Sequence, residues 1–173
     1  MKTENKIRTY SEIAKIAKEL RKEGRIIITT NGSFDILHYA HVNILEKAKN
    51  EGDVLIVLLN SDSSIKKLKG ESRPIIPEDE RARMLAALEC VDYVVIFNED
   101  NPLKLLRIIK PHKHVKGGSF IEERIRKEKE LLATWEGEFK NFELEDGFST
   151  TNIINKIVEK ENGLGENKER KKH

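Results

Sequence analysis

Two histidines that stand three positions apart, His38 and His41, are the residues of this chain best suited to chemistry on a charged group. Residues three apart on a helix lie on the same face, so both imidazoles would reach one bound group. Gly32 precedes them, and a glycine allows the backbone to approach a phosphate closely. An isolated histidine pair is more often structural, but this spacing after a predicted strand favours stabilisation of charge on a bound phosphate.

A turn between a strand and a helix is predicted to position these residues. Residues 25–29 form a short apolar and β-branched run, which is typical of a buried strand. Val42, Leu45 and Ala48 then recur at helical spacing. In an open parallel sheet such a turn lies at the carboxyl end of its strand, where the free N–H groups and the positive dipole of the helix face a crevice. We therefore expect an anion to bind there.

The rest of the chain alternates between strand and helix patterns, which indicates an α/β fold. A helix is predicted over residues 11–23, with Ser11 as its N-cap. Further strands are predicted at residues 54–59, 92–97, 112–116 and 138–142, and further helices after the turn, at 78–91, 102–110 and 122–131, and from about 150 onward. We expect a single-domain, Rossmann-like, doubly wound parallel sheet of about five strands.

Length and composition favour one domain that acts on small molecules. The chain has 173 residues, 38% of them hydrophobic, and a formal net charge of only +2, so no overall field recruits nucleic acid. The single cysteine, Cys90, excludes an intramolecular disulfide. No run resembles a signal peptide or approaches the ~18 apolar residues of a membrane span, which predicts a cytoplasmic protein. Residues 1–161 are assigned to the domain, and the mostly charged residues 162–173 to a disordered tail.

Three other segments are predicted to open onto the same crevice. Residues 60–70 contain three lysines, residues 116–118 pair two glycines after a lysine, and residues 149–151 place three hydroxyls at the start of a helix. Each segment has an ordinary interpretation, as a solvated helix, a turn and a helix cap respectively. Their position beside the expected anion site instead favours contacts with a polyphosphate.

The turn resembles the G-x-F-D-x-x-H-x-G-H signature of the cytidylyltransferase-like nucleotidyltransferases. The signature is matched at Gly32, Phe34, Asp35, His38 and His41, while Ala40 replaces its last glycine. Within this superfamily, residues 60–62, 68–74, 115–118 and 145–154 are most similar to the D-glycero-β-D-manno-heptose 1-phosphate adenylyltransferases. Those enzymes occur as separate proteins and as the carboxyl-terminal part of a fused kinase.

The resemblance implies transfer of AMP from ATP to a sugar 1-phosphate, which gives an ADP-sugar and pyrophosphate, with Mg²⁺ accompanying ATP. It implies no metal held by the protein itself. Catalytic roles fall on His38, His41 and Lys66. Nucleotide binding falls on Ser33, Phe34, Tyr39, Ala40, Lys69, Arg73, Lys116, Gly117, Ser149, Thr150 and Thr151, and binding of the second substrate on Asn31, Gly32, Asp35 and Ser119.

Three alternatives remain open at this point. The glycerol-3-phosphate cytidylyltransferases and the archaeal FAD synthetases share the signature turn, although the former carry Arg-Thr-x-Gly where residues 144–147 read Leu-Glu-Asp-Gly. Ala40 also leaves a catalytically silent nucleotide-binding module in play. An apolar helix face left over after core packing would indicate a homodimer.

Overall fold

The computed structural model describes residues 2–118, 122–143 and 149–169. Ser119, which the sequence assigns to substrate binding, lies outside the described residues. Residues 144–147, which bear on the comparison with cytidylyltransferases, lie outside them as well.

A parallel five-stranded sheet forms the centre of the described chain. Its strands lie in the order β3-β2-β1-β4-β5, and every neighbouring pair runs parallel. Because all strands run the same way, their carboxyl ends meet at one edge of the sheet. The predicted doubly wound fold is confirmed. The strands are β1 Ile27–Gly32, β2 Val54–Asn60, β3 Tyr93–Phe97, β4 Lys113–Gly117 and β5 Glu138–Phe142.

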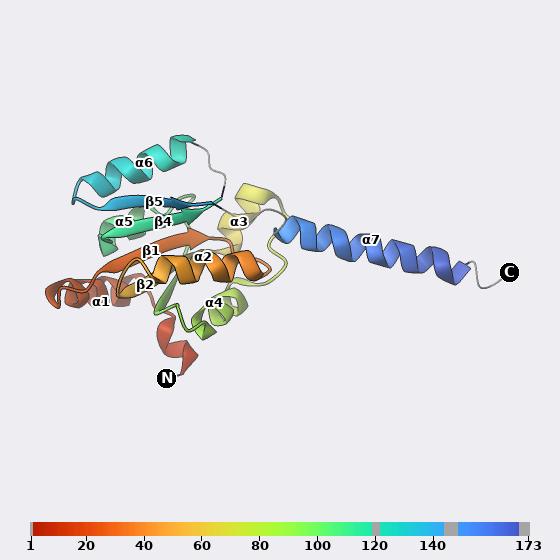
Figure 1. The fold of residues 1–173 in the computed structure, drawn as a ribbon, viewed down its shortest axis with the longest axis horizontal. Coiled ribbons are helices and arrows are strands. Elements are labelled where there is room, and N and C mark those ends of the chain that lie inside the picture. Colours follow the sequence, from red (N-terminus) through yellow and green to blue (C-terminus); the bar gives the residue numbers. More distant parts are fainter. Residues whose placement is uncertain (1, 119–121, 144–148, 170–173) are drawn as a thin grey trace.

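Helices cover both faces of this sheet (Figure 1). One face packs against α1, α5 and α6, and the other against α2 and α4, while α3 lies at the carboxyl edge. The helices are α1 Tyr10–Lys22, α2 Tyr39–Lys49, α3 Asp62–Lys69, α4 Glu78–Ala87, α5 Leu103–Ile109, α6 Glu122–Ala133 and α7 Thr150–Glu169, and a short 3₁₀ helix, η1, spans Thr3–Lys6.

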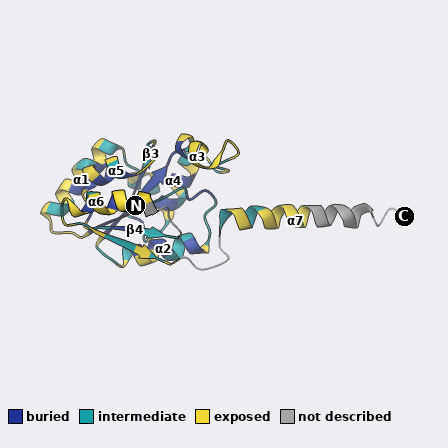
Figure 2. Cartoon of the chain, turned by 90° about the horizontal axis from the view of Figure 1, so that it is seen from above, coloured by how far each residue is buried: buried dark blue, intermediate teal, exposed yellow. Residues whose placement is uncertain are grey.

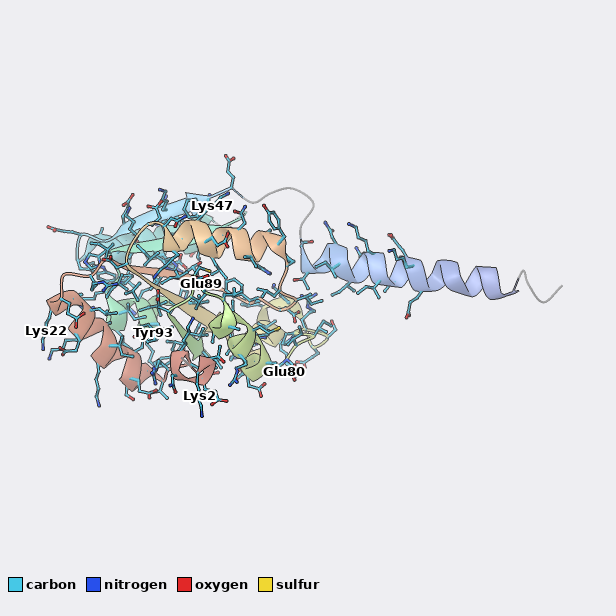
Figure 3. All side chains as sticks on the ribbon, turned by 60° about the horizontal axis from the view of Figure 1, so that its bottom comes forward. Lys2, Lys22, Lys47, Glu80, Glu89 and Tyr93 are labelled. Carbon is cyan, nitrogen blue, oxygen red and sulfur yellow. The ribbon has the colours of Figure 1, made fainter. Side chains whose placement is uncertain are left out.

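Strand β2 shows why the sheet is covered on both sides. All its residues are buried. Leu55, Val57 and Leu59 belong to the core under α2 and α4, whereas the alternate residues Ile56 and Leu58 belong to the core under α1 and α5. An uninterrupted apolar run is what a parallel strand with two covered faces requires. Charged residues such as Lys47 on α2 and Glu80 on α4 lie on the outer surface (Figure 3).

The first helix begins earlier than the sequence predicts. Thr9, rather than Ser11, is the N-cap of α1, because its hydroxyl accepts from the Glu12 backbone N–H while the Glu12 carboxylate accepts from the Thr9 backbone N–H. This reciprocal capping box satisfies two donors that would otherwise lack partners. Ser11 has no acid at the matching position three residues later, since Ala14 stands there.

Helix α7 departs from the sequence-based prediction in its packing. The helix extends away from the rest of the chain (Figures 1 and 2), and Ile157 and Val158 of its predicted apolar stripe are 55% and 51% exposed. Its backbone is helical to Glu169, and the disorder of residues 162–173 stays a prediction. Charged residues such as glutamate and lysine have high helix propensity even where they cannot pack. A homodimer stays a prediction.

No helix among the described residues is both long enough and apolar enough to cross a bilayer.

Candidate active site

A cavity of about 570 Å³ opens at the carboxyl edge of the sheet, beside the end of β1. Its lining comes from four separate parts of the chain, which are the end of β1 with the turn into α2, the end of α3 with the loop after it, the end of β4, and the start of α7. The lining residues are Thr30, Asn31, Gly32, Ser33, Phe34, His38, His41, Ile44, Lys69, Arg73, Gly117, Ser149, Thr150 and Thr151.

The turn from β1 into α2 is tightly packed and strained. Phe34 has a φ of 45°, which is unfavourable for a residue with a side chain, and its ring is 6% exposed. A Cβ atom on Gly32 would lie 3.0 Å from that ring, so the glycine is needed for close packing. The Phe34 ring lies 5.1 Å from the ring of His41, centroid to centroid. Phe34 thus supports one of the two histidines.

The two histidines lie together at the start of α2, as the spacing predicts. Their rings stack at a centroid distance of 3.8 Å with an interplanar angle of 22°. The Nδ1 atoms of both rings are buried and have no hydrogen-bond partner within the described residues. Burial lowers the pKa of His41 to about 4, an effect to which His38 and Lys69 add, and burial also lowers the pKa of His38. The pair is therefore neutral near pH 7 and prepared to contact an anion.

These depressed pKa values predict that the protein loses stability in acid. The unfolded chain takes up protons near the ordinary histidine pKa of 6.5, whereas folded His41 does so only near 4. Unfolding therefore binds protons between these values, and stability is fully present above about pH 6.5 and falls as the pH drops toward 4. A His41→Asn variant should lose less unfolding free energy than the wild type between about pH 7 and about pH 5. Urea titrations at both pH values measure this, and equal losses in the two proteins would contradict the assignment.

Two cations complete the same wall of the cavity. Lys69 ends α3, and Arg73 follows it in the loop. Burial lowers the pKa of Lys69, and the charge of Arg73 adds to this effect. Arg73 Nη2 lies 2.6 Å from Asp35 Oδ2 in an ion pair, while Asp35 Oδ1 accepts from the backbone N–H groups of Ile75 and Ile76 at 2.7 and 3.0 Å. Asp35 is 1% exposed and does not line the cavity, so its carboxylate anchors the loop that carries Arg73.

A fully buried arginine that the sequence analysis missed joins the loops around the cavity. Arg81 on α4 donates to the backbone carbonyls of Ser33, Asn60 and Ile76 at 2.5, 2.9 and 2.8 Å. It also donates to Asp62 Oδ1 at 2.6 Å. The ends of β1 and β2 and the start of α4 are thereby held by one guanidinium, which fixes their carbonyls in the geometry of the site.

The start of α7 brings the hydroxyl cluster to the cavity. Ser149 Oγ accepts from the backbone N–H of Asn152 at 3.1 Å, which is the hydrogen bond of a helix cap. The ordinary interpretation of Ser149, as a helix cap, is therefore correct, although Ser149 also lines the cavity together with Thr150 and Thr151.

At the end of β4, a Cβ atom on Gly117 would lie 2.0 Å from Ile44 Cδ1, so close packing with Ile44 requires this glycine.

Residues 29–156 match the family described as cytidylyltransferase-like. The chain belongs to the cytidylyltransferase-like family. The bifunctional protein HldE of Aliarcobacter butzleri is 51% identical over 155 residues, which are 90% of this chain and 32% of that protein. The bifunctional protein HldE of Geobacter metallireducens is 48% identical over 153 residues, which are 88% of this chain and 31% of that protein. The chain thus spans about a third of the curated relatives that it matches, and the similarity indicated by its motifs is confirmed.

Solved structures agree with the cytidylyltransferase-like fold. The lipopolysaccharide core biosynthesis protein of Thermoplasma volcanium has a TM-score of 0.58 and 26% identity, and the match covers 70% of this chain and 98% of that one. The pantoate-beta-alanine ligase of Francisella tularensis, crystallised with an ATP compound and beta-alanine, has a TM-score of 0.60 and 18% identity, with 88% and 77% covered. The second likeness shows the fold alone. Family membership identifies the chain as a nucleotidyltransferase.

The cavity of this cytidylyltransferase-like chain contains most of the residues that the sequence analysis selects, but not all of them. Thr30 and Ile44 line it although no motif identified them. Tyr39 is 57% exposed, Ala40 is buried in α2, and Lys66 is exposed on α3. Of the predicted residues that the structure describes, five are absent from the lining, namely Asp35, Tyr39, Ala40, Lys66 and Lys116.

The lining does not offer the ligands of a protein-held metal ion. Magnesium prefers carboxylate and phosphate oxygens, and no acidic residue is among the described residues that line this cavity. Within the described part of the chain, no cluster of three metal-ligating side chains exists either. The donors of the cavity are instead imidazoles, cations, hydroxyls and amides, which suit phosphate oxygens.

Proposed function

We propose that this nucleotidyltransferase transfers AMP from ATP to a sugar 1-phosphate and releases pyrophosphate. One observation carries the proposal. Two stacked imidazoles, whose buried Nδ1 atoms have no hydrogen-bond partner among the described residues, face the same cavity as Lys69, Arg73 and the hydroxyls of residues 149–151. Donors converge on this cavity, and no acid stands among its described lining residues, which fits a polyanion such as a triphosphate.

In the proposed reaction, a phosphate oxygen of the acceptor attacks the α-phosphorus of ATP. The new P–O bond forms as the bond between the α-phosphorus and the α,β-bridging oxygen breaks, and pyrophosphate leaves with the electron pair. The attacking phosphate is already an anion near neutral pH, so no strong general base is required. The task is to bring two anions together and to stabilise charge on the α-phosphate and the leaving group.

Each group of cavity residues is assigned the phosphates that its position favours. His38 and His41, at the start of α2, are proposed to contact the α- and β-phosphates, where the positive end of the helix adds to their effect. Lys69 and Arg73 would neutralise the outer phosphates. Thr150 and Thr151, at the start of α7, would donate to the departing pyrophosphate.

Magnesium is proposed to enter as part of the ATP complex. Phosphate oxygens and water would hold it, since the described lining residues provide no carboxylate. When bound, the ion would neutralise charge on the triphosphate. The metal is thus treated as part of the substrate.

The proposed acceptor is D-glycero-β-D-manno-heptose 1-phosphate, which places the chain in ADP-heptose biosynthesis. Two features support this choice. Residues 145–154 and the Lys-Gly-Gly turn are similar to the corresponding parts of the heptose 1-phosphate adenylyltransferases, and the relatives 44–51% identical over about 90% of this chain are bifunctional HldE proteins. A cytoplasmic location follows as part of the proposal, because ATP is available there.

The silent-module alternative receives no support from the position of Ala40. Its side chain is 1% exposed within α2 and does not line the cavity, so its methyl group does not occupy the space of a ligand. Alanine at position 40 therefore leaves the space of the cavity as glycine would.

The test is a substrate matrix. Pyrophosphate release is measured with each of the four nucleoside triphosphates against heptose 1-phosphate, other sugar 1-phosphates, glycerol 3-phosphate and FMN. Release that depends on ATP and heptose 1-phosphate supports the proposal. Release that depends on CTP with glycerol 3-phosphate, or on ATP with FMN, would replace it with one of the related activities.

Replacing Thr150 and Thr151 singly with valine should separate a phosphate contact from a helix cap. Valine keeps the shape and removes the hydroxyl, and the cap hydrogen bond belongs to Ser149. At least one valine variant should therefore keep the melting temperature of the free protein and lose much of the stabilisation by ATP, by about 1.5–3 kcal/mol of binding free energy. Ser149→Ala removes the cap hydrogen bond and should lower the stability of the free protein by ~1 kcal/mol, which gives the size of a cap loss for comparison. Normal ATP stabilisation in both valine variants would place the leaving group elsewhere.

A further inference from the structure

A buried polar cluster lies directly behind the cavity wall, and the reaction described above does not use it. His114 on β4 is completely buried, and Glu128 on α6 is 2% exposed. Lys116 Nζ donates to Glu128 Oε1 at 2.6 Å, so the acid is one half of an ion pair. The sequence assigns Lys116 to the nucleotide, but this contact turns it toward α6. Burying charged and polar groups is costly unless they are hydrogen-bonded or paired, as these groups are.

The ring of His114 bridges two residues of the neighbouring strand β1. Register pairs Thr29 with His114, and Thr29 Oγ1 lies 2.8 Å from His114 Nδ1. Asn31 Oδ1 lies 3.2 Å from His114 Nε2. Of these three residues, Asn31 is the one that lines the cavity. His114 therefore connects the interior of the sheet to a polar group of the substrate wall.

The neighbours of His114 Nδ1 indicate that this nitrogen accepts a hydrogen bond and carries no proton. Burial lowers the pKa of His114 to about 3, with the charge of Lys116 adding to the effect, so the ring is neutral near pH 7 and carries one N–H. The hydroxyl of Thr29 has one proton to donate. Its other acceptor, the Lys113 carbonyl oxygen, lies 3.5 Å away, which is much less favourable than 2.8 Å. The distances therefore favour donation from Thr29 to His114 Nδ1.

The neighbours of His114 Nε2 indicate that this nitrogen carries the ring proton. Nε2 faces the Asn31 oxygen at 3.2 Å and, at 3.8 Å, Glu128 Oε2. An unprotonated Nε2 would direct its lone pair toward this carboxylate, which is unfavourable. These neighbours favour a proton on Nε2 of His114, donated to the Asn31 oxygen.

We propose that His114 is a positioning residue that holds the side-chain amide of Asn31 in one orientation, with its Nδ2 hydrogens turned into the cavity. Since His114 occupies Oδ1, Asn31 presents only donors to a substrate. Such a wall accepts an oxygen or an unprotonated ring nitrogen and rejects a donor at the same place. Glu128 and Lys116 maintain the tautomer. The inference rests on the proposed function for the identity of the substrates, but not for the orientation of the amide.

The first test needs no substrate. Nitrogen-15 NMR of the full-length protein reports which ring nitrogen of His114 carries the proton, with His114→Gln used to assign the signals. The proposal predicts the Nε2–H tautomer. An Nδ1–H tautomer, or a positively charged ring at pH 7, would overturn it.

The second test measures binding with a matched set of variants. His114→Leu removes the donor, and His114→Gln restores an N–H close to the position of Nε2. His112→Leu alters a histidine just before β4 that contacts Ile27 and does not line the cavity. Calorimetry with α,β-methylene-ATP and with heptose 1-phosphate should show at least one ligand bound about tenfold more weakly by His114→Leu, with His114→Gln and His112→Leu close to the wild type.

Unchanged affinity for both ligands in a folded His114→Leu protein, with only its melting temperature lowered, would reduce His114 to a structural residue and overturn the proposal. If the wild type does not bind heptose 1-phosphate, the proposed acceptor fails. The tautomer and the affinity for the ATP analogue then still decide the role of His114.

Discussion

A His41→Ala enzyme should turn over on the order of 10²–10³ times more slowly than the wild type, with a much smaller change in stability. His41 is stacked on His38 at 3.8 Å, and its Nδ1 atom is buried without a partner within the described residues. A group held in this way in the free protein contributes most when charge develops on the α-phosphate. The loss should therefore appear in kcat more than in the KM for ATP.

Steady-state pyrophosphate release measures this effect, and His112→Ala provides the control. His112 accepts from the backbone N–H of Ile27 at the amino end of the sheet, away from the cavity. Its replacement should leave kcat within a few-fold while costing some stability. If His41→Ala retains wild-type kcat, the histidines are not the groups that stabilise the transferred phosphate.

Arg81→Met should destabilise the protein by about 3–5 kcal/mol, although Arg81 contacts no predicted substrate. The variant preserves most of the volume but removes the donors to three backbone carbonyls and to Asp62. These acceptors lie at the ends of two strands and near the start of a helix. In the variant they lose their donor beside the completely buried position of Arg81, where leaving polar groups without a partner is costly.

Arg83→Met is the matched control on the same helix. Arg83 donates to Glu4 at 2.5 Å, but its side chain is 49% exposed, so its loss should cost within about 1 kcal/mol. Urea unfolding of the two variants compares them directly. Equal and small effects would show that the carbonyls around Arg81 are satisfied in another way.

The strand-to-helix turn was predictable because its determinants are contiguous. An apolar run, Gly32 and two histidines at helical spacing specify a strand, a close approach and a shared face within one short stretch. The doubly wound sheet followed from the regular alternation of strand and helix patterns. These features depend on local sequence, and the structure confirms them.

The roles of charged residues beyond the turn were less predictable, because burial depends on distant segments. Arg81 lies in a helix with an acidic first turn and reads as a surface residue, until the carbonyls of Ser33 and Asn60 converge on it. Lys116 follows a motif expected to bind a nucleotide, yet Glu128, from a helix rich in charged residues, pairs with it. Lys66 lies one turn before Lys69 and remains exposed.

The proposed transfer of AMP to a sugar 1-phosphate is tested most directly by following the α-phosphate of ATP. ATP labelled at the α-phosphorus is incubated with Mg²⁺, heptose 1-phosphate and the protein, and the products are separated. The proposed function predicts that the label appears in an ADP-sugar in amounts equal to the pyrophosphate released, and that His41→Ala nearly abolishes both. Label recovered only as ATP, AMP or ADP, with no sugar adduct, would contradict it.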